Sequence, residues 1–258
     1  MKILVCGDAM EDVYWTGSVS RLSPEAPVPV VSVENVETRG GGAANVANTI
    51  EALGVECVRV FGPGEDIRKI RLMAGKQHVA RIDFDYPQQP INPDGAYAAC
   101  LRYCDIVVFI DYGKGSLANV QELIAAARAR GCAVLVDPKG GDYAKYRGAT
   151  MIKPNEATVI EWASIPVMDY GFDYVLCTRG AAGMTLYSDK HDIMKDYPAE
   201  NAFPVDVSGA GEAAIAAYAA AMAKGMQPVE CARYASKAAG IACAHQGTYV
   251  VKAEELWD

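Results

Sequence analysis

Short apolar segments alternate with Ala-rich segments along most of the chain, and this alternation restricts the possible fold more than any other feature. The apolar segments are continuously apolar, which favours strands that are covered on both faces. We expect strands at residues 3–7, 55–62, 106–111, 133–137, 150–153 and 174–177. We expect helices at residues 43–53, 95–103, 117–129, 156–163, 209–223 and 228–245. This order predicts an α/β fold, a three-layer sandwich with a mostly parallel central sheet.

Two segments depart from this pattern. Residues 26–36 partly alternate between apolar and polar and contain two prolines, which suits an edge strand. Residues 77–86 alternate in the same way. We expect these segments to form a small antiparallel flap over one end of the sheet. Because 258 residues can bury one large core, we expect a single domain over residues 1–258 that carries this flap.

The composition narrows the class of function. A net charge of −8 argues against binding to nucleic acid or to an anionic membrane, since both need a basic face. The apolar start of the chain is too short for a secretory signal, and the Ala-rich run 210–223 is too short to span a bilayer. We therefore expect a cytoplasmic protein. Its eight cysteines and three histidines have no metal-binding spacing, which favours thiols packed in the core.

The segment 206–212, Asp-Val-Ser-Gly-Ala-Gly-Glu, directly precedes the longest Ala-rich run. Its small residues leave backbone N–H groups open to an anion at the start of the expected helix, where the helix dipole adds partial positive charge. The carboxylate of Glu212 can accept a proton from a hydroxyl that attacks a phosphoryl group held there. The segment indicates phosphoryl transfer, and a glycine-containing loop that caps a buried helix remains the alternative.

Further polar residues follow the expected strands. Asp8 and Asp12 follow the first strand, and the run 39–45, with three glycines and an asparagine, opens the next helix. The segments 153–156 (Lys-Pro-Asn-Glu) and 178–180 (Thr-Arg-Gly) follow later strands. Each motif alone is equally typical of a turn. Because the carboxyl ends of parallel strands meet at one edge of a sheet, their convergence predicts an active site there.

Taken together, these motifs resemble the ribokinase (PfkB) family of sugar kinases. The order Gly-Gly-x-x-Asn, strand-end Asn, Thr-Arg-Gly and Asp-x-x-Gly-Ala-Gly-acid is similar to that family's pattern. The chain resembles most closely the D-glycero-β-D-manno-heptose 7-phosphate kinase branch, the kinase half of the bacterial ADP-heptose synthase. The similarity covers nearly the whole chain and lies in residues 7–15, 20–30, 39–47, 80–85, 111–117 and 137–155.

The resemblance implies a ribokinase-like kinase that uses ATP and Mg²⁺ to phosphorylate the 1-hydroxyl of a heptose 7-phosphate, for nucleotide-heptose and surface-polysaccharide synthesis. The implied sugar-binding residues are Asp8, Asp12, Gly41, Gly42 and Asn45, and the candidates for the sugar's phosphate are Arg81, Lys114 and Lys139. The implied nucleotide-binding residues are Asn155, Thr178, Arg179, Gly180, Asp206, Gly209 and Gly211. The implied catalytic group consists of Gly209, the N–H groups of Ala210 and Gly211, and Glu212 as base. Asn155 and Glu156 are the implied metal-binding residues.

The chain departs from the family's pattern in three places, and these departures leave other functions open. Glu212 replaces an aspartate, which displaces the base by roughly 1 Å, and a displacement of that size can cost about 10²-fold in rate. The family's Asn-x-x-Glu ends at Thr158 here, and the chain is short after Asp66. These changes leave open a sugar-phosphate- or nucleotide-binding homologue without turnover, and a kinase for another sugar. A homodimer formed through the flap is a further expectation.

Overall fold

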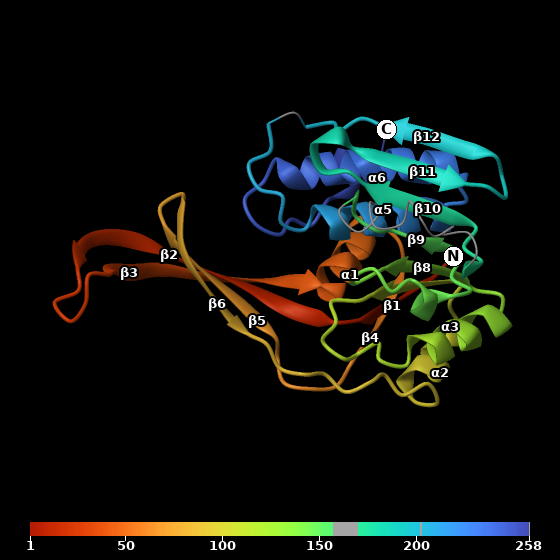
Figure 1. The fold of residues 1–258 in the computed structure, drawn as a ribbon, viewed down its shortest axis with the longest axis horizontal. Helices are drawn as coiled ribbons and strands as arrows, with labels where there is room; N and C mark the ends of the chain where they lie inside the picture. Colours follow the sequence, from red (N-terminus) through yellow and green to blue (C-terminus); the bar gives the residue numbers. More distant parts are fainter. Residues whose placement is uncertain (157–169, 202, 258) are drawn as a thin grey trace.

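The computed structural model describes residues 1–156, 170–201 and 203–257. An eight-stranded sheet forms the body, and a separate four-stranded sheet projects from one end of it (Figure 1). Helices cover both faces of the large sheet. The expected fold class, an α/β sandwich with a mostly parallel sheet and a small additional β-sheet, is confirmed.

The large sheet has the order β12-β11-β10-β9-β8-β7-β1-β4. Its parallel strands are β1 (Ile3–Gly7), β4 (Cys57–Phe61), β7 (Ile106–Ile110), β8 (Ala133–Asp137), β9 (Met151–Ile152) and β10 (Tyr174–Thr178). Two antiparallel strands, β11 (Met184–Ser188) and β12 (Ile193–Tyr197), extend one edge. All six strands expected from sequence are strands in this sheet, with boundaries that differ by a few residues at most.

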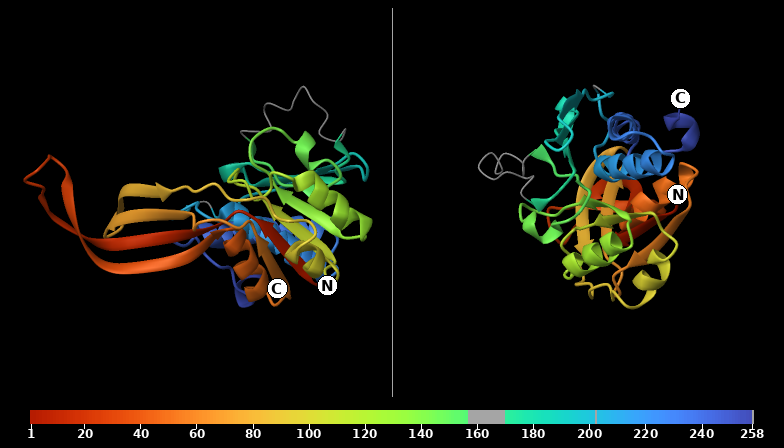
Figure 2. Two further views of the ribbon diagram at one scale, coloured as in Figure 1. Left: turned by 90° about the horizontal axis from the view of Figure 1, so that it is seen from below. Right: turned by 90° about the vertical axis from the view of Figure 1, so that its right-hand side faces the viewer.

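Successive residues of the central strands enter two different cores. Ile3 and Val5 of β1 pack in the core with α1 (Ala43–Ala52), α5 and α6, whereas Leu4 and Cys6 pack in the core with α2 and α3. The remaining helix bounds are α2 (Ala96–Leu101), α3 (Val120–Ala129), α5 (Ala210–Ala223), α6 (Pro228–Cys243) and α7 (Ala253–Leu256), with short 3₁₀ turns η1 (Ala144–Tyr146) and η4 (Gly180–Ala182). Figure 2 shows α2 and α3 on one side of the sheet and α5 and α6 on the other. This two-sided burial explains why the strands are continuously apolar.

The expected helices correspond to α1, α2, α3, α5 and α6. Of the expected helix at residues 156–163, only Glu156 lies among the described residues. Within the described part of the chain, no helix is both long and apolar enough to cross a membrane. The eight cysteines are free thiols, four of them buried and four half-buried.

The four-stranded sheet, hereafter the lid, consists of β2 (Ala9–Leu22), β3 (Pro29–Gly42), β5 (Arg68–Ala74) and β6 (Gln77–Phe84) in the order β3-β2-β5-β6. The segments 26–36 and 77–86 therefore contribute its two outer strands and do not pair with each other. The inner strands β2 and β5 were not anticipated. In β2, buried and exposed residues do not alternate, because the strand leaves the core beyond Gly17, so period-two patterning gives no signal.

The lid is joined directly to the body. Strand β2 begins two residues after β1 ends, and β3 ends immediately before α1 begins. After Asp66 the chain enters β5 almost at once, so the short connection noted in the sequence leads straight into an inner lid strand. The lid is thus rooted at the carboxyl edge of the large sheet, where the polar motifs were expected to meet.

Candidate active site

The start of helix α5 presents backbone donors at this edge. Gly209, the residue before the helix, has φ +78°, a left-handed conformation that glycine adopts without strain. The Ala210 N–H, expected to bind the anion together with that of Gly211, instead donates to the Val207 carbonyl at 3.3 Å. In the described structure no backbone acceptor faces the N–H groups of Gly211 and Glu212. Free N–H groups at the positive end of the helix dipole form a site for an anion.

Asp206 orders the loop before this helix. One of its carboxylate oxygens accepts the Ser208 N–H, and the other accepts the Gly247 N–H, both at 2.9 Å. These backbone hydrogen bonds lower the pKa of Asp206, although its partial burial acts in the opposite direction. The carboxylate thereby ties the entrance of α5 to the loop that follows α6.

Glu212 lies in the first turn of α5 with 8% of its surface exposed. The hydroxyl of Tyr112, from the loop after β7, donates a hydrogen bond to the Glu212 carboxylate. Burial, and the nearby carboxylates of Glu212 and Asp137, hold the pKa of Tyr112 well above its ordinary value. The hydroxyl therefore keeps its proton and acts as a donor. Sequence reasoning identified Glu212 and missed Tyr112.

A buried cation lies beside the same helix start. The Lys153 ammonium pairs with Asp137 at 3.0 Å, and its side chain is almost fully buried. A Cβ atom on Gly211 would stand 3.3 Å from Lys153 Nζ, so the absence of a side chain at Gly211 allows this approach. Burial raises the pKa of Asp137 to about 6, and Lys153 partly opposes that shift. The position combines a cation with free N–H groups.

The inner face of the lid carries three charged residues over the site. Asp12 of β2 is buried and forms an ion pair with Arg71 of β5. Lys69, two residues earlier and on the same face of β5, lies over the Tyr112 ring with Nζ 5.1 Å from its centroid. Burial lowers the pKa of Lys69, and the nearby carboxylates of Asp12, Asp83 and Glu212 oppose this. Sequence reasoning missed Lys69 and Arg71, although their spacing of two in a β-strand places them on one face.

Buried polar side chains without a hydrogen-bond partner in the described structure include Asn45 and Thr248, which lie at the entrance of α5. Both side-chain polar atoms of Asn45 and the hydroxyl of Thr248 are buried without a hydrogen bond. A Cβ atom on Gly209 would stand 3.3 Å from Asn45 Nδ2 and 3.4 Å from Thr248 Cγ2, so the two side chains flank the entrance of α5. Buried polar atoms are nearly always satisfied in the functional state, so these indicate a polar ligand or water.

Asp8 has a different environment from the one expected. It is fully buried, and its carboxylate accepts the backbone N–H groups of Tyr112 at 2.8 Å, Lys114 at 3.0 Å and Ser116 at 3.2 Å. Both oxygens are thus occupied by the loop after β7. The geometry supports a role in holding that loop, and direct sugar binding by Asp8 stays a prediction. Gly41 packs so closely on Asp12 that a side chain there would collide with its carboxylate, and a side chain on Gly42 would collide with the Asp8 carbonyl oxygen.

The three cations expected at the sugar's phosphate differ in their surroundings. Arg81 is exposed and pairs with Asp83 of the same strand at 2.8 Å. Lys114 pairs at 2.8 Å with Asp85 at the end of the lid. The Lys139 side chain lies close to Gly113, with Cγ 3.4 Å from where a Cβ atom would stand, and no ion pair of its ammonium is found among the described residues.

The expected nucleotide-binding residues follow β9 and β10. Asn155 and Thr178 form an isolated β-bridge, and the Thr178 hydroxyl donates to the Pro154 carbonyl at 3.3 Å. Arg179 pairs with Asp196 at 3.0 Å, and Gly180, with φ +54°, begins the short turn η4. These residues therefore share the carboxyl edge with the entrance of α5.

The donors expected at a metal ion are hard oxygen ligands. Asn155 and Glu156 are both exposed at the end of β9. An amide and one carboxylate suit Mg²⁺, which commonly keeps several waters and is completed by nucleotide phosphates. No group of three or more potential metal ligands occurs among the residues that the structure describes. Thr158, the altered position of the motif, lies outside the described residues.

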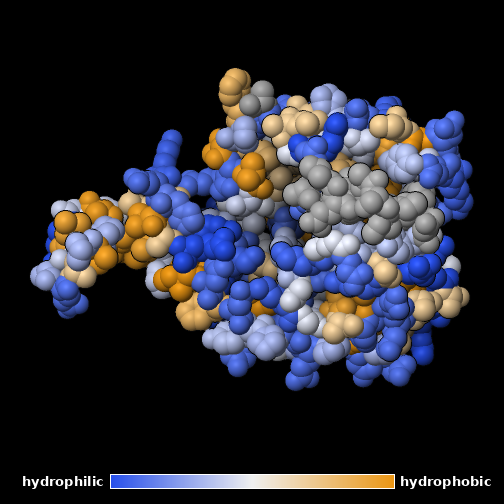
Figure 3. Space-filling model, viewed as in Figure 1, coloured by the Kyte–Doolittle hydropathy of each residue, from blue (hydrophilic) through white to orange (hydrophobic). Residues whose placement is uncertain are grey.

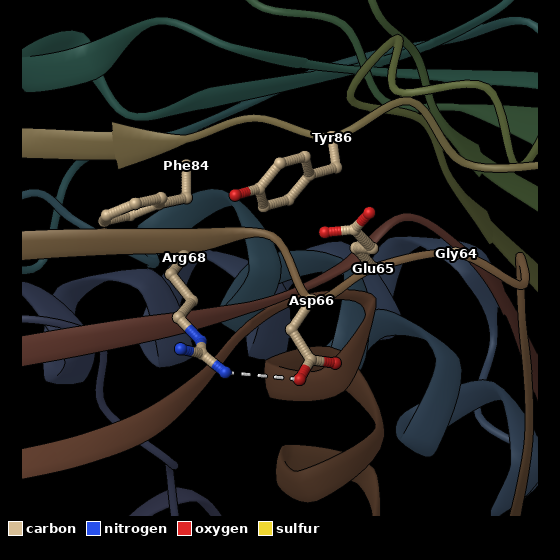
Figure 4. A pocket seen from close by; sticks show the side chains of 6 residues that line it. All are labelled: Gly64, Glu65, Asp66, Arg68, Phe84 and Tyr86. Atoms are coloured by element: carbon tan, nitrogen blue, oxygen red, sulfur yellow. Dashed lines mark hydrogen bonds and ion pairs between the residues drawn. The ribbon is translucent and has the colours of Figure 1, made fainter.

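Two hollows of about 360 Å³ each lie at the root of the lid. Figure 4 shows the first, with Phe84, Tyr86 and Glu65 around it and Arg68 paired with Asp66 at 3.4 Å. Arg68 points away from the face that carries Lys69, because neighbouring residues of a strand alternate. Neither hollow is lined by Asp12, Asn45 or Glu212.

The sequence of residues 93–255 matches the pfkB family of carbohydrate kinases. The chain belongs to this family, and it is a carbohydrate kinase by that membership. Its fold is similar to those of the ribokinase of Arabidopsis thaliana complexed with ribose and ATP (TM-score 0.76, 18% identity, 98% of this chain and 96% of that one) and the ribokinase of Thermotoga maritima (TM-score 0.75, 17% identity, 98% and 97%).

Two relatives are considerably more similar in sequence. The chain is 38% identical to the D-beta-D-heptose 7-phosphate kinase of Bordetella bronchiseptica, over 99% of this chain and 95% of the relative. It is 38% identical to the bifunctional protein HldE of Pseudomonas fluorescens, over 98% of this chain. The chain spans about 62% of the length of that bifunctional relative. The alignment to the Bordetella protein runs over 298 positions, 40 more than the 258 residues here, so the relative contains segments that this chain lacks.

Proposed function

We propose that the protein transfers the γ-phosphoryl group of ATP to the 1-hydroxyl of a heptose 7-phosphate, in the cytoplasm. One observation carries the proposal: the Glu212 carboxylate lies in the helix turn whose free N–H groups face the same space as a buried cation, Lys153. A carboxylate beside free backbone donors and a cation supports proton acceptance next to a bound phosphoryl group. The two relatives supply the substrate class, because one is named a heptose 7-phosphate kinase.

The residues divide the chemistry between them. Glu212 takes the proton of the sugar's 1-hydroxyl, whose oxygen forms a bond to the γ-phosphorus while the bond to the bridging oxygen breaks and ADP leaves. The N–H groups of Gly211 and Glu212 and the ammonium of Lys153 stabilise the charge on the transferring group. Magnesium bound with the nucleotide near Asn155 and Glu156 would neutralise phosphate charge.

The sugar is placed between the lid and α1. The unpartnered side chain of Asn45 and the carboxylate of Asp12 bind its hydroxyls, close to the glycines that lack obstructing side chains. Among the cations near the site, Lys69 and Lys139 have no carboxylate ion pair in the described part of the chain, whereas Arg71 and Lys114 are already paired. Lys69 and Lys139 are therefore the better candidates for the sugar's phosphate.

The lid also offers a surface for a second copy of the chain. The exposed apolar residues of β2, β3 and the turn between them include Val19, Leu22, Val28, Val33 and Val36. Figure 3 shows apolar surface on the projecting lid. A homodimer that pairs the lids would cover this surface. For such a homodimer, light scattering should give a mass near 55 kDa, twice the 27.5 kDa of the chain. The Val33→Asp variant should have the mass of one chain.

The assay that tests the function measures ADP release with four acceptors: heptose 7-phosphate, the unphosphorylated heptose, fructose 6-phosphate and ribose. The expected result is a kcat/KM for heptose 7-phosphate at least a hundredfold above the others. Glu212→Gln should lower kcat by about 10²- to 10⁴-fold, the usual contribution of a general base. Glu122→Gln is the matched control, because Glu122 also occupies the third residue of a helix, α3, and is exposed.

The alternatives have their own outcomes. Tight binding of heptose 7-phosphate without turnover, unrestored by Glu212→Asp, would establish a binding protein that has lost catalysis. Turnover confined to an unphosphorylated sugar would establish a kinase for another substrate. Either outcome refutes the proposed reaction.

A further inference from the structure

The acidic residue at the start of α5 is a glutamate, Glu212, whose side chain has one more methylene than an aspartate. A glutamate has an additional side-chain torsion, so its carboxylate occupies more positions than that of an aspartate unless it is held. In the described structure, the hydrogen bond that holds the Glu212 side chain comes from Tyr112. The two residues are 100 positions apart in the chain.

Tyr112 is itself held rigidly. Its backbone N–H donates to Asp8 at 2.8 Å, and the next N–H, that of Gly113, donates to Asp111 at 2.7 Å. Its ring packs against Gly42, where a Cβ atom would stand 3.4 Å from Tyr112 Cε2. Two buried carboxylates therefore fix the backbone of this loop, and the ring has Gly42 and the Lys69 ammonium as neighbours.

The hydroxyl of Tyr112 bonds one oxygen of the Glu212 carboxylate, Oε1. The other oxygen, Oε2, remains available to an acceptor hydroxyl, since a carboxylate accepts several hydrogen bonds. Burial keeps the tyrosine protonated, so the hydrogen bond keeps one direction throughout the ordinary pH range. The arrangement allows Glu212 to be held and to accept a proton at the same time.

We infer that Tyr112 is a positioning residue for Glu212, whose hydroxyl holds the longer acidic side chain where it can take the proton of the sugar hydroxyl. The inference rests on the proposed function and adds a residue that adapts this particular chain to a glutamate base. The carboxylate of a shorter aspartate would lie roughly 1 Å further from Tyr112. The tyrosine should therefore matter for Glu212 and matter little for an aspartate at the same position.

A double-mutant cycle tests this relation. Tyr112→Phe is expected to lower kcat about 10- to 100-fold, because misplacement of a base by about 1 Å costs up to about 10²-fold, while the sugar KM stays within about threefold. In the Glu212→Asp background, the same change should alter kcat less than about threefold. Tyr97→Phe is the control for loss of a buried hydroxyl, since Tyr97 donates to the Leu123 carbonyl at 2.7 Å in the other core.

Equal falls of kcat in the two backgrounds, or no fall with Glu212, would overturn the inference. If the wild-type protein has no turnover with any acceptor, the proposed function fails, and crystal structures of the wild type and of Tyr112→Phe test the inference instead. The inference then predicts one ordered position of the Glu212 carboxylate in the wild type and a displaced position in Tyr112→Phe. An identical Glu212 position in both structures would overturn it.

Discussion

Replacing Asp8 with asparagine should lower the free energy of unfolding, and this loss of stability should be its main effect, rather than a loss of sugar affinity. Asp8 is fully buried, and its carboxylate accepts three backbone N–H groups from the loop after β7. Oδ2 accepts those of Tyr112 and Lys114, and Oδ1 accepts that of Ser116. Asparagine has nearly the same shape but replaces one of these oxygens with an NH₂ donor, so at least one backbone donor loses its acceptor.

The magnitude follows from the hydrogen bonds that are lost. A hydrogen bond to a charged group contributes about 1.5–3 kcal/mol, and the remaining bonds to a neutral amide oxygen are weaker. The net loss for Asp8→Asn is therefore roughly 3 kcal/mol. For a chain of this size, 1 kcal/mol shifts the melting temperature by about 2–4 °C, so the expected fall is about 6–12 °C.

The measurement is thermal unfolding followed by circular dichroism, together with the sugar KM of the same variant. Asp94→Asn provides the control, because Asp94 is exposed. A variant that melts within about 2 °C of the wild type while its sugar KM rises tenfold or more would refute the loop-holding role. That result would assign Asp8 to direct sugar binding instead.

Three further predictions concern the helix entrance and its surroundings. Gly211→Ala adds a Cβ atom 3.3 Å from Lys153 Nζ. In steady-state assays this variant should have a kcat/KM for ATP at least tenfold below that of the wild type, with a melting temperature within about 2 °C of the wild type. Unchanged ATP kinetics would contradict this prediction. Arg71→Met leaves the buried carboxylate of Asp12 unpaired, and urea unfolding should show a loss of roughly 3 kcal/mol; a stability within about 0.5 kcal/mol of the wild type would count against it. Burial raises the pKa of Asp137 in the folded protein from 3.8 to about 6. The folded protein therefore binds the Asp137 proton more tightly than the unfolded chain does. The stability that this proton contributes is lost as the pH rises from about 4 to 6. The stability of the wild type relative to Asp137→Asn should fall over that range by an amount on the order of 2 kcal/mol, and a pH-independent difference would disprove it.

Much of the body could be predicted because strands that are buried on both faces consist of continuous apolar residues. The strand at residues 133–137 and the start of α5 followed from local runs of residue types alone. The lid was only half predicted. Its outer strands alternate visibly, but the inner strand β2 runs from the buried core to an exposed tip, so no single period describes it.

The site was predictable in its backbone and less so in its side-chain partners. The small residues before Glu212 predicted a helix start whose backbone N–H groups are open to an anion, because this accessibility depends only on residue size and helix geometry. Lys69 and Arg71 were missed, since charged residues of a strand have no local signature of the neighbour they face. Tyr112 and Lys153 stood inside recognised motifs, and their sequence neighbours did not indicate what they contact.

By itself, the sequence determined the layered α/β fold, the family and the small-residue entrance to α5, because each depends on residue types within a few positions of one another. Only the tertiary structure decided that Asp8 holds a loop more than 100 residues away and that Tyr112 bonds Glu212 across 100 residues. The physical reason is that a hydrogen bond is formed between whichever groups the packed strands bring within about 3 Å. No local pattern records that distance.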